Sequence, residues 1–361
     1  MPKTYWHLLS ARRMPTEYEL VSSDLLYHPR MGYAVRTPVV DFQARHPLSL
    51  SCANWEAFRD PRQTTYASYV TEQRDKENYI DRLLGSIDGT DYDRTLNPTW
   101  LHVLESVFAP LRYPCHGLHM ASAYIAQGAP AGRIAIAAAF QTGDELRRVQ
   151  RIAYRTQQLM QVQPAFAADA QARWEREPAW QPLRETVERL LVCYEWGEAF
   201  VALNLVVKPL FDEFVSSQLA SFAREQRDDV LARLLLSLRE DQLWHRAWSV
   251  ALVQHVLVHT EVAQPATELR SCPVTYPATE LRSCPDNLSS MQRAIAKWQP
   301  RAEASVLALS ELCASVCGDR AQLLAACVAE QRRCLAAAGL LTAAPHNPVQ
   351  DDAAGAAGNA A

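Results

Sequence analysis

Glycine is scarce in this sequence: only 12 of the 361 residues are glycine. Alanine, leucine, arginine and glutamate dominate the middle of the chain instead, and these residues favour helices. Apolar residues make up 48% and charged residues 21%, an ordinary balance for a globular protein with a sizeable core. The sequence therefore predicts a largely helical protein of one large domain or two ordinary ones.

Other features are missing, and each absence excludes a class of protein. The net charge is −4 and the sequence contains no run of basic residues, which argues against electrostatic binding of nucleic acid. The longest apolar stretches, such as Val201–Val207, are too short to span a bilayer, and the first residues lack the pattern of a signal peptide. No Ser-His-Asp string, phosphate-binding glycine loop or dinucleotide fingerprint is present. We therefore expect a cytoplasmic protein outside the hydrolase, kinase and Rossmann classes.

The nine cysteines are scattered from Cys52 to Cys334 without a Cys-x-x-Cys pair. A disulfide framework or a thiolate zinc site would need closer grouping. Cys313 and Cys317 are four residues apart and could share a helix face. We expect core packing there rather than metal binding, at odds of about nine to one, because cysteine is so commonly buried.

The first sixty residues differ from the rest because aromatic residues alternate with Pro15, Pro29, Pro38 and Pro47. Prolines at this spacing exclude a long helix, and the aromatic residues are too many for a disordered tail. The segment is interpreted as an extended arm whose aromatic side chains pack either on the body of this chain or on a partner.

Helical periodicity begins after Asp60-Pro61 and continues, with breaks, to about Leu340. Helices with buried faces are predicted over Trp100–Gln127 (interrupted by prolines), Arg133–Leu159, Leu183–Val207 and Asp228–Val258. Four such helices are the minimum for a bundle core. Two further helical segments are predicted at Leu288–Lys297 and Arg301–Gly339.

Between these regions, Pro265–Pro273 is repeated residue for residue as Pro277–Pro285. Two copies are too few for a repeat architecture, so we interpret them as a tandem duplication in a tolerant surface loop. The alanine- and glycine-rich residues 341–361 are predicted to be disordered.

Two incomplete motifs on predicted core helices point to a particular chemistry. Diiron carboxylate proteins hold two irons in a four-helix bundle, with single glutamates on two helices and Glu-x-x-His pairs on the other two. Glu145 begins one such spacing, but Arg148 stands in place of the histidine. His245 ends a second, but Gln242 stands in place of the glutamate. The fixed positive charge of an arginine repels iron.

Taken alone, these residues also have an ordinary interpretation. We weigh each motif at about four to one in favour of surface or packing residues. A buried Glu145–Arg148 pair bridging one helical turn would be a natural structural use.

An ordered set of motifs across the chain favours the relation to diiron proteins over the ordinary structural interpretation. The set comprises Trp55–Gln63, Tyr66, Tyr69, Pro110–Tyr113, His116, Met120–Tyr124, Ala153–Thr156, Trp174–Trp180, Trp196–Val201 and Leu203–Pro209. In this order, over about residues 4–260, the chain resembles the β subunit of the hydroxylase in soluble bacterial multicomponent diiron monooxygenases, the toluene, benzene and phenol monooxygenase group.

The resemblance implies an all-α, ferritin-like (ribonucleotide-reductase-like) helical bundle. The expected organisation is an extended arm at 1–60, the bundle at 61–260, the duplicated loop at 261–287, C-terminal helices at 288–340 and the tail at 341–361. In this family the α subunit carries the diiron centre, and the β subunit is a relative without metal. Glu145, Arg148, Gln242 and His245 are then degenerate ligand positions, and no catalytic, cofactor-binding or metal-binding residue is expected in this chain.

The other ligand positions are also expected to be lost. On the helix around Gly197 the counterpart of a single glutamate is glycine, flanked by Glu195 and Glu198. Around Cys115–His119 no carboxylate is available.

The resemblance also implies partners and a reaction. The chain would pair with an iron-bearing α subunit and a small γ subunit, two copies of each, and work with an effector protein, a ferredoxin and an NADH reductase. The complex would insert one oxygen atom of O₂ into an aromatic or alkene substrate. The N-terminal arm and helix faces between Leu101 and Leu159 are predicted to be contact surface, because their apolar content exceeds what one bundle needs.

Two rival functions stay open at this point. One is an autonomous diiron enzyme with an atypical ligand set drawn from Glu145, Glu195 or Glu198, and His245. The other is a helical scaffold unrelated to oxygen chemistry.

Overall fold

The computed structural model describes residues 16–23, 49–260 and 286–341, and within these ranges all regular structure is helical. Its longer helices are α3 (Tyr66–Gly85), α5 (Arg112–Gln127), α6 (Gly132–Val162), α8 (Gln181–Leu191), α12 (Asp229–Val258), α13 (Asn287–Leu312) and α14 (Arg320–Ala337). The shorter ones are α1 (Glu17–Ser23), α4 (Pro98–Val103), α7 (Ala170–Arg176), α9 (Trp196–Val201), α10 (Lys208–Asp212) and α11 (Leu219–Glu225).

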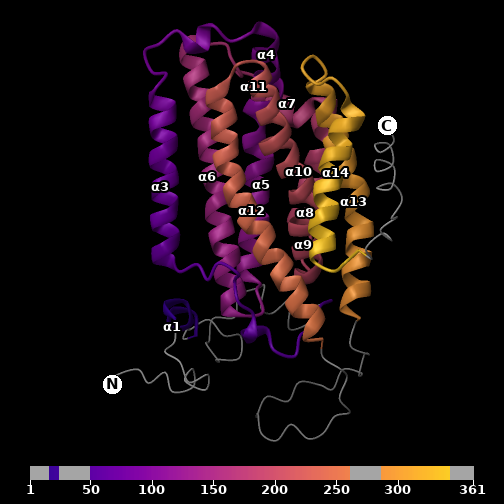
Figure 1. The fold of residues 1–361 in the computed structure, drawn as a ribbon. Coiled ribbons are helices and arrows are strands. Elements are labelled where there is room, and N and C mark those ends of the chain that lie inside the picture. The colour runs from indigo at the N-terminus through magenta and orange to yellow at the C-terminus, as the bar shows by residue number, and fades with distance from the viewer. Residues whose placement is uncertain (1–15, 24–48, 261–285, 342–361) are drawn as a thin grey trace, which may run out of the picture.

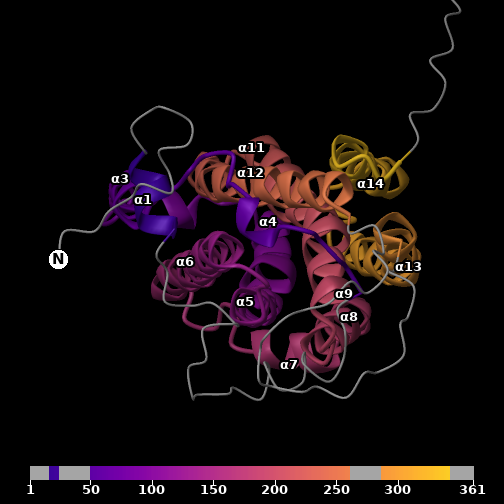
Figure 2. The same cartoon turned by 90° about the horizontal axis from the view of Figure 1, so that it is seen from below.

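Four helical segments enclose the core: α5, α6, the run from α9 to α11, and α12. Seen from below, α5 and α6 lie side by side, with α12 and α9 across the core from them (Figure 2). Helix α3 stands outside α6 and α12, while α13 and α14 cover the opposite flank (Figure 1). This arrangement confirms the predicted all-α bundle.

A buried polar network joins these four segments at the centre of the core. The indole N–H of Trp248 on α12 donates to the amide oxygen of Gln141 on α6 at 3.0 Å. The amide nitrogen of Gln141 in turn donates to Ser122 of α5 at 3.1 Å and to Asn204 at 2.8 Å. All four residues are buried, so each bond replaces one that water would otherwise supply.

The two most regular helices were predictable from the sequence. The helix predicted over Arg133–Leu159 is confirmed as α6, and the one over Asp228–Val258 is confirmed as α12. Asp228 starts α12 because its carboxylate accepts the backbone N–H of Leu231, as N-cap residues do.

The single helix predicted over Leu183–Val207 is wrong. Helix α8 ends at Leu191, and Glu195 starts a new helix by accepting the N–H groups of Gly197 and Glu198. That helix does not end at Lys208-Pro209 but continues to Glu225 through two π-helical turns, η7 (Ala202–Val207) and η8 (Glu213–Gln218).

Pro209 is tolerated inside this run for a visible reason. Proline cannot donate to the carbonyl four residues earlier, that of Leu205. The side chain of Gln331 on α14 donates to the Leu205 carbonyl instead, at 3.5 Å.

The C-terminal prediction also needs correction. Pro300 does not separate two helices, because α13 runs through it from Asn287 to Leu312. The apolar face formed by Trp298, Ala302 and Val306 is buried on both sides of the proline and keeps the helix intact. The break falls instead before Asp319, which caps α14.

Part of the predicted N-terminal arm is helical. Helix α1 packs against α6, and Tyr18 is buried on the body of this chain, where its hydroxyl accepts the backbone N–H of Asp60. Residues 1–15 and 24–48 of the arm, the duplicated segment 265–285 and the tail beyond residue 341 lie outside the described residues.

Two other expectations can be compared with the structure. Cys313 and Cys317 are both buried free thiols, so the predicted core packing is confirmed. Among the described helices, none is long and apolar enough to cross a membrane.

Candidate functional site: a buried charge cluster

Four charged side chains meet at the centre of the bundle. Helix α6 contributes Glu145 and Arg148, and α10 contributes Lys208 and Asp212, each pair being one helical turn apart. These four residues, called the central cluster below, have side chains at most 3% exposed. Full burial of four charges in one core is unusual and requires compensation.

The compensation is a closed ring of ion pairs. Arg148 contacts Glu145 at 3.1 Å and Asp212 at 2.6 Å. Lys208 contacts Asp212 at 3.2 Å and is also hydrogen-bonded to Glu145. Two positive and two negative charges therefore cancel. Burial alone would raise the pKa of Asp212, but Lys208 and Arg148 outweigh it and hold that pKa below its usual value.

A second layer of polar contacts surrounds the cluster. His245 on α12 lies 2.9 Å from Asp144 through Nε2, and its Nδ1 lies 3.8 Å from Glu145. Asp144 also accepts hydrogen bonds from Tyr69 at 2.9 Å and from Gln73 at 2.8 Å, both on α3. Burial, and then the neighbouring charge of Asp241, raise the pKa of the Asp144 carboxyl.

Asp241 anchors the outer edge of this layer. Its carboxylate contacts Lys76 on α3 at 2.7 Å and Arg147 on α6 at 2.6 Å. Arg147 also pairs with Glu77 at 2.6 Å. Gln73 also donates to Asp241 at 3.0 Å, so polar contacts link both Asp144 and Asp241 to α3.

The structure brings together three of the four predicted ligand-like residues. Glu145 and Arg148 form the predicted buried pair across one turn, and His245 lies beside them. Gln242 is also buried but is directed toward η8, where its amide nitrogen donates to Ser216 at 2.7 Å.

Sequence reasoning missed Lys208 and Asp212, although a signal for them exists. Asn204, Lys208 and Asp212 recur every four residues within an otherwise apolar stretch, Ala199–Asp212, so all three lie on one helix face. Polar residues with this spacing in a buried segment indicate a site inside the core.

The placement of Gly197 at the single-glutamate position is wrong, because Asp212 is the carboxylate that this run brings into the cluster. A Cβ atom on Gly197 would meet Ser49 at 2.6 Å and Leu50 at 2.9 Å, so the glycine serves close packing. Glu195 caps α9, and Glu198 accepts hydrogen bonds from Lys297 and Trp298. The ligand set of the autonomous diiron enzyme is therefore not assembled.

The donor set of the central cluster does not fit a pair of irons. Arg148 and Lys208 offer only N–H donors, and both carboxylates are already paired with them. Cys115, the nearest thiol on α5, is fully buried, and burial raises its pKa to about 12, so it stays protonated. Within the three described ranges, no group of three or more His, Cys, Asp or Glu residues could hold a metal ion.

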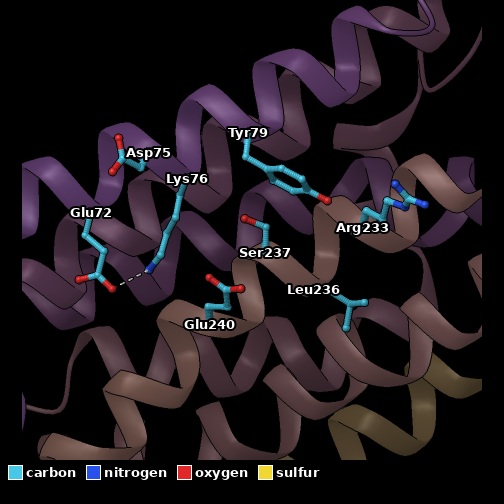
Figure 3. Close-up of a pocket in the computed structure, with 8 residues that line it drawn as sticks. All are labelled: Glu72, Asp75, Lys76, Tyr79, Arg233, Leu236, Ser237 and Glu240. Atoms are coloured by element: carbon cyan, nitrogen blue, oxygen red, sulfur yellow. Dashed lines mark ion pairs between the residues drawn. The ribbon is translucent and has the colours of Figure 1, made fainter.

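A surface groove of about 490 Å³ lies outside this layer, between α3 and α12 (Figure 3). Glu72, Asp75 and Lys76 line one wall, and Arg233 and Glu240 line the other. The groove mixes both signs of charge and is open to solvent. It contains no histidine or cysteine, and its Lys76 is engaged by Glu72 and Asp241, so no catalytic grouping is apparent there.

The buried histidine makes a testable contribution to acid sensitivity. Burial first, and then Lys208 and Arg148, hold the pKa of His245 well below 6.5. As the pH falls below about 6.5, the unfolded chain protonates this histidine while the folded chain does not, so stability decreases. We expect the unfolding free energy of both chains to depend on pH, with a steeper decrease in the native chain than in His245→Gln. The difference between the two slopes should reach up to about 1.4 kcal/mol per pH unit.

The measurement is urea denaturation of both chains at several pH values between 5 and 7.5. All other titratable residues are shared, so the difference between the two curves reports on His245 together with its contact to Asp144. Parallel curves would contradict a neutral buried His245.

Comparisons with known proteins agree with this architecture. A family model described as Methane/Phenol/Alkene Hydroxylase matches residues 33–260. The hydroxylase component subunit beta of the toluene-4-monooxygenase system from Ectopseudomonas mendocina is 38% identical over 264 residues, which cover 71% of this chain and 81% of that protein. An oxygenase component of phenol 2-monooxygenase from Pseudomonas sp. strain CF600 is 24% identical and covers 73% of this chain and 72% of that protein.

Solved structures give the same result. A chain of toluene 4-monooxygenase, solved with toluene in the resting active site, has a TM-score of 0.73 and 34% identity, and covers 87% of this chain and 99% of that one. A chain of xenon-pressurized phenol hydroxylase from Pseudomonas sp. OX1 shares the fold, with a TM-score of 0.76 at 21% identity.

The chain therefore belongs to the methane/phenol/alkene hydroxylase family of oxidoreductase components. Within that family it is a homologue of the hydroxylase β subunits, as the match to the toluene-4-monooxygenase β subunit shows. The resemblance seen in the sequence motifs is confirmed.

Proposed function

We propose that this chain is a β subunit without metal in an aromatic-hydrocarbon monooxygenase hydroxylase, where it supports an α subunit that holds the diiron centre. The observation that carries the proposal is the central cluster. Arg148 and Lys208 supply two fixed positive charges at the position where a diiron bundle would hold its metal ions, and Glu145 and Asp212 neutralise them. Because these charges balance one another, the bundle needs no metal ion to offset its two buried carboxylates.

The α and γ subunits, the effector protein, the ferredoxin and the NADH reductase of such a system are the partners that the resemblance supplies. A toluene-like substrate is favoured because identity is 38% to the toluene-4-monooxygenase β subunit, against 26% to the methane monooxygenase β chain. The chemistry on O₂ and substrate would take place in the α subunit. The residues described above would have the role of keeping this subunit rigid.

The test is the iron content of the chain, purified alone and reconstituted with ferrous iron, compared with that of the complex formed with its larger partner. We expect essentially no iron in the isolated chain and iron in the complex. Two tightly held irons per isolated chain would overturn the proposal and favour the autonomous diiron enzyme.

The scaffold alternative is tested by the same complex. A chain that binds no iron and also fails to form a complex with a larger diiron subunit would support a scaffold unrelated to oxygen chemistry.

A further inference from the structure

The outer surface of α5 and α6 exposes no charged side chain over a stretch of fifty residues. Between Tyr113 and Val162 there are seven charged residues, and all are buried: Arg133, Asp144, Glu145, Arg147, Arg148, Arg151 and Arg155. The exposed positions of this stretch therefore carry no aspartate, glutamate, lysine or arginine. On a 31-residue surface helix such as α6, the solvent-facing side is normally charged.

Other helices of the same chain follow the normal pattern. Exposed charged residues occur at Glu72 and Asp75 on α3, at Glu185 and Glu188 on α8, and at Arg332 and Arg333 on α14. The absence of exposed charge on α5 and α6 is therefore not a general property of the helices of this protein.

The exposed side chains on this outer strip come from both helices. Six positions define what we call the α5–α6 face: His116 and Met120 on α5, and Ala139, Leu146, Gln150 and Tyr154 on α6. Met120, Leu146 and Tyr154 are 41%, 40% and 48% exposed, which is high for residues of this size and polarity. A hydrogen bond holds the two helices together, because His119 Nδ1 lies 2.9 Å from the carbonyl oxygen of Thr142.

The two helices are large enough to carry an interface. At 1.5 Å per residue, α6 is about 46 Å long and α5 about 24 Å, and helices are about 10 Å wide, so the two helices together project roughly 700 Å², of which the strip is one part. A standard protein–protein interface buries about 800 Å² per partner, with charged residues depleted at its centre.

We infer that the α5–α6 face is the surface on which the larger hydroxylase subunit docks, through a helix surface of its own that is likewise free of charge. The inference rests on the proposed function, which supplies a larger subunit as the occupant. Small side chains such as Ala139 toward the start of α6 allow a partner helix to approach closely, while Leu146, Gln150 and Tyr154 fill the wider part of the contact. The face is the outer side of the two helices that also carry Cys115, Glu145 and Arg148, so docking would brace the charged core from outside.

The test uses the native complex, formed by co-expression of the chain with the large hydroxylase subunit of the same system. Leu146→Glu places one charge in the middle of the face, and its matched control is Leu307→Glu, at a 44% exposed leucine on α13. Both changes lie on exposed helix surface and are expected to leave folding intact, which thermal unfolding of each chain checks. Gln150→Arg provides a second variant on the same face.

We expect Leu146→Glu and Gln150→Arg to lower the amount of co-purified large subunit by roughly tenfold or more, because each leaves an unpaired charge in the contact. Leu307→Glu should behave as the native chain does. Equal recovery for all four chains would overturn the α5–α6 face as the docking surface while leaving the proposed function intact. If instead light scattering of the chain alone shows a dimer that Leu146→Glu dissolves, with large-subunit recovery unchanged, the occupant is a second copy and the inference fails. No recovery even with the native chain would contradict the proposed function itself.

Discussion

Replacing Arg148 with methionine is expected to lower the unfolding free energy by about 3–5 kcal/mol, because it leaves two buried carboxylates with one partner fewer. Methionine preserves much of the side-chain volume, so the loss reflects charge more than packing. Arg148 sits between Glu145 and Asp212 with only 2% of its side chain exposed, and no water can replace its hydrogen bonds there without entering the core.

Chemical denaturation of the purified variants measures this effect. The control is Arg189→Met, which removes an exposed pair with Glu185 on α8 and should cost less than about 1 kcal/mol. A loss at Arg148 no larger than that of the control would contradict the ion-paired cluster.

The same cluster predicts an unusual recovery. Removing all four charges together, with Glu145→Leu, Arg148→Met, Lys208→Met and Asp212→Leu, leaves no unpaired group. Buried ion pairs replaced in this way by apolar residues often give equal or higher stability. The fourfold variant should therefore be more stable than Arg148→Met alone, in spite of carrying three more substitutions.

Replacing Trp248 with alanine is expected to cost about 3–5 kcal/mol as well, for a different reason. Trp248 is fully buried, packs against Phe200 with ring centroids 5.6 Å apart, and supplies the N–H that holds Gln141. The substitution both opens a large cavity and removes that donor.

Trp248→Phe separates these two contributions. Phenylalanine keeps most of the ring volume but has no N–H, so it leaves the Gln141 amide oxygen without its partner, at a cost of about 1–3 kcal/mol. Denaturation of both variants provides the comparison. If Trp248→Phe were as damaging as Trp248→Ala, the hydrogen bond rather than ring volume would dominate, contrary to expectation.

Much of the fold was predictable because α6 and α12 each combine a long periodic pattern with clear ends, such as Asp228 at the start of α12. The failures have physical causes. Leu183–Val207 contains no proline or glycine pair to mark its interruption at Glu195, and Pro300 lies in a helix whose flanking apolar residues are buried strongly enough to offset it. Local sequence signals predict neither the interruption at Glu195 nor the continuation of the helix through Pro300.

The site was predictable in the same uneven way. Glu145, Arg148 and His245 follow the three-residue spacing that diiron bundles use, so the sequence alone placed them together. Lys208 and Asp212 escaped because they match no metal-binding pattern, and only their burial beside Glu145 reveals them. The absence of exposed charge on α5 and α6 likewise becomes visible only when buried and exposed arginines can be told apart.

The π-helical turns on either side of α10 change how residues on this run should be matched with those of relatives. Each such turn holds one residue more than an α-helical turn, so everything beyond it is rotated by about 100° around the axis relative to an unbroken helix. Lys208 and Asp212 lie between η7 and η8. The direction of these two side chains toward the core therefore depends on a single additional residue upstream. Two related chains can be identical around Lys208-Pro209 and still turn different helix faces toward the core.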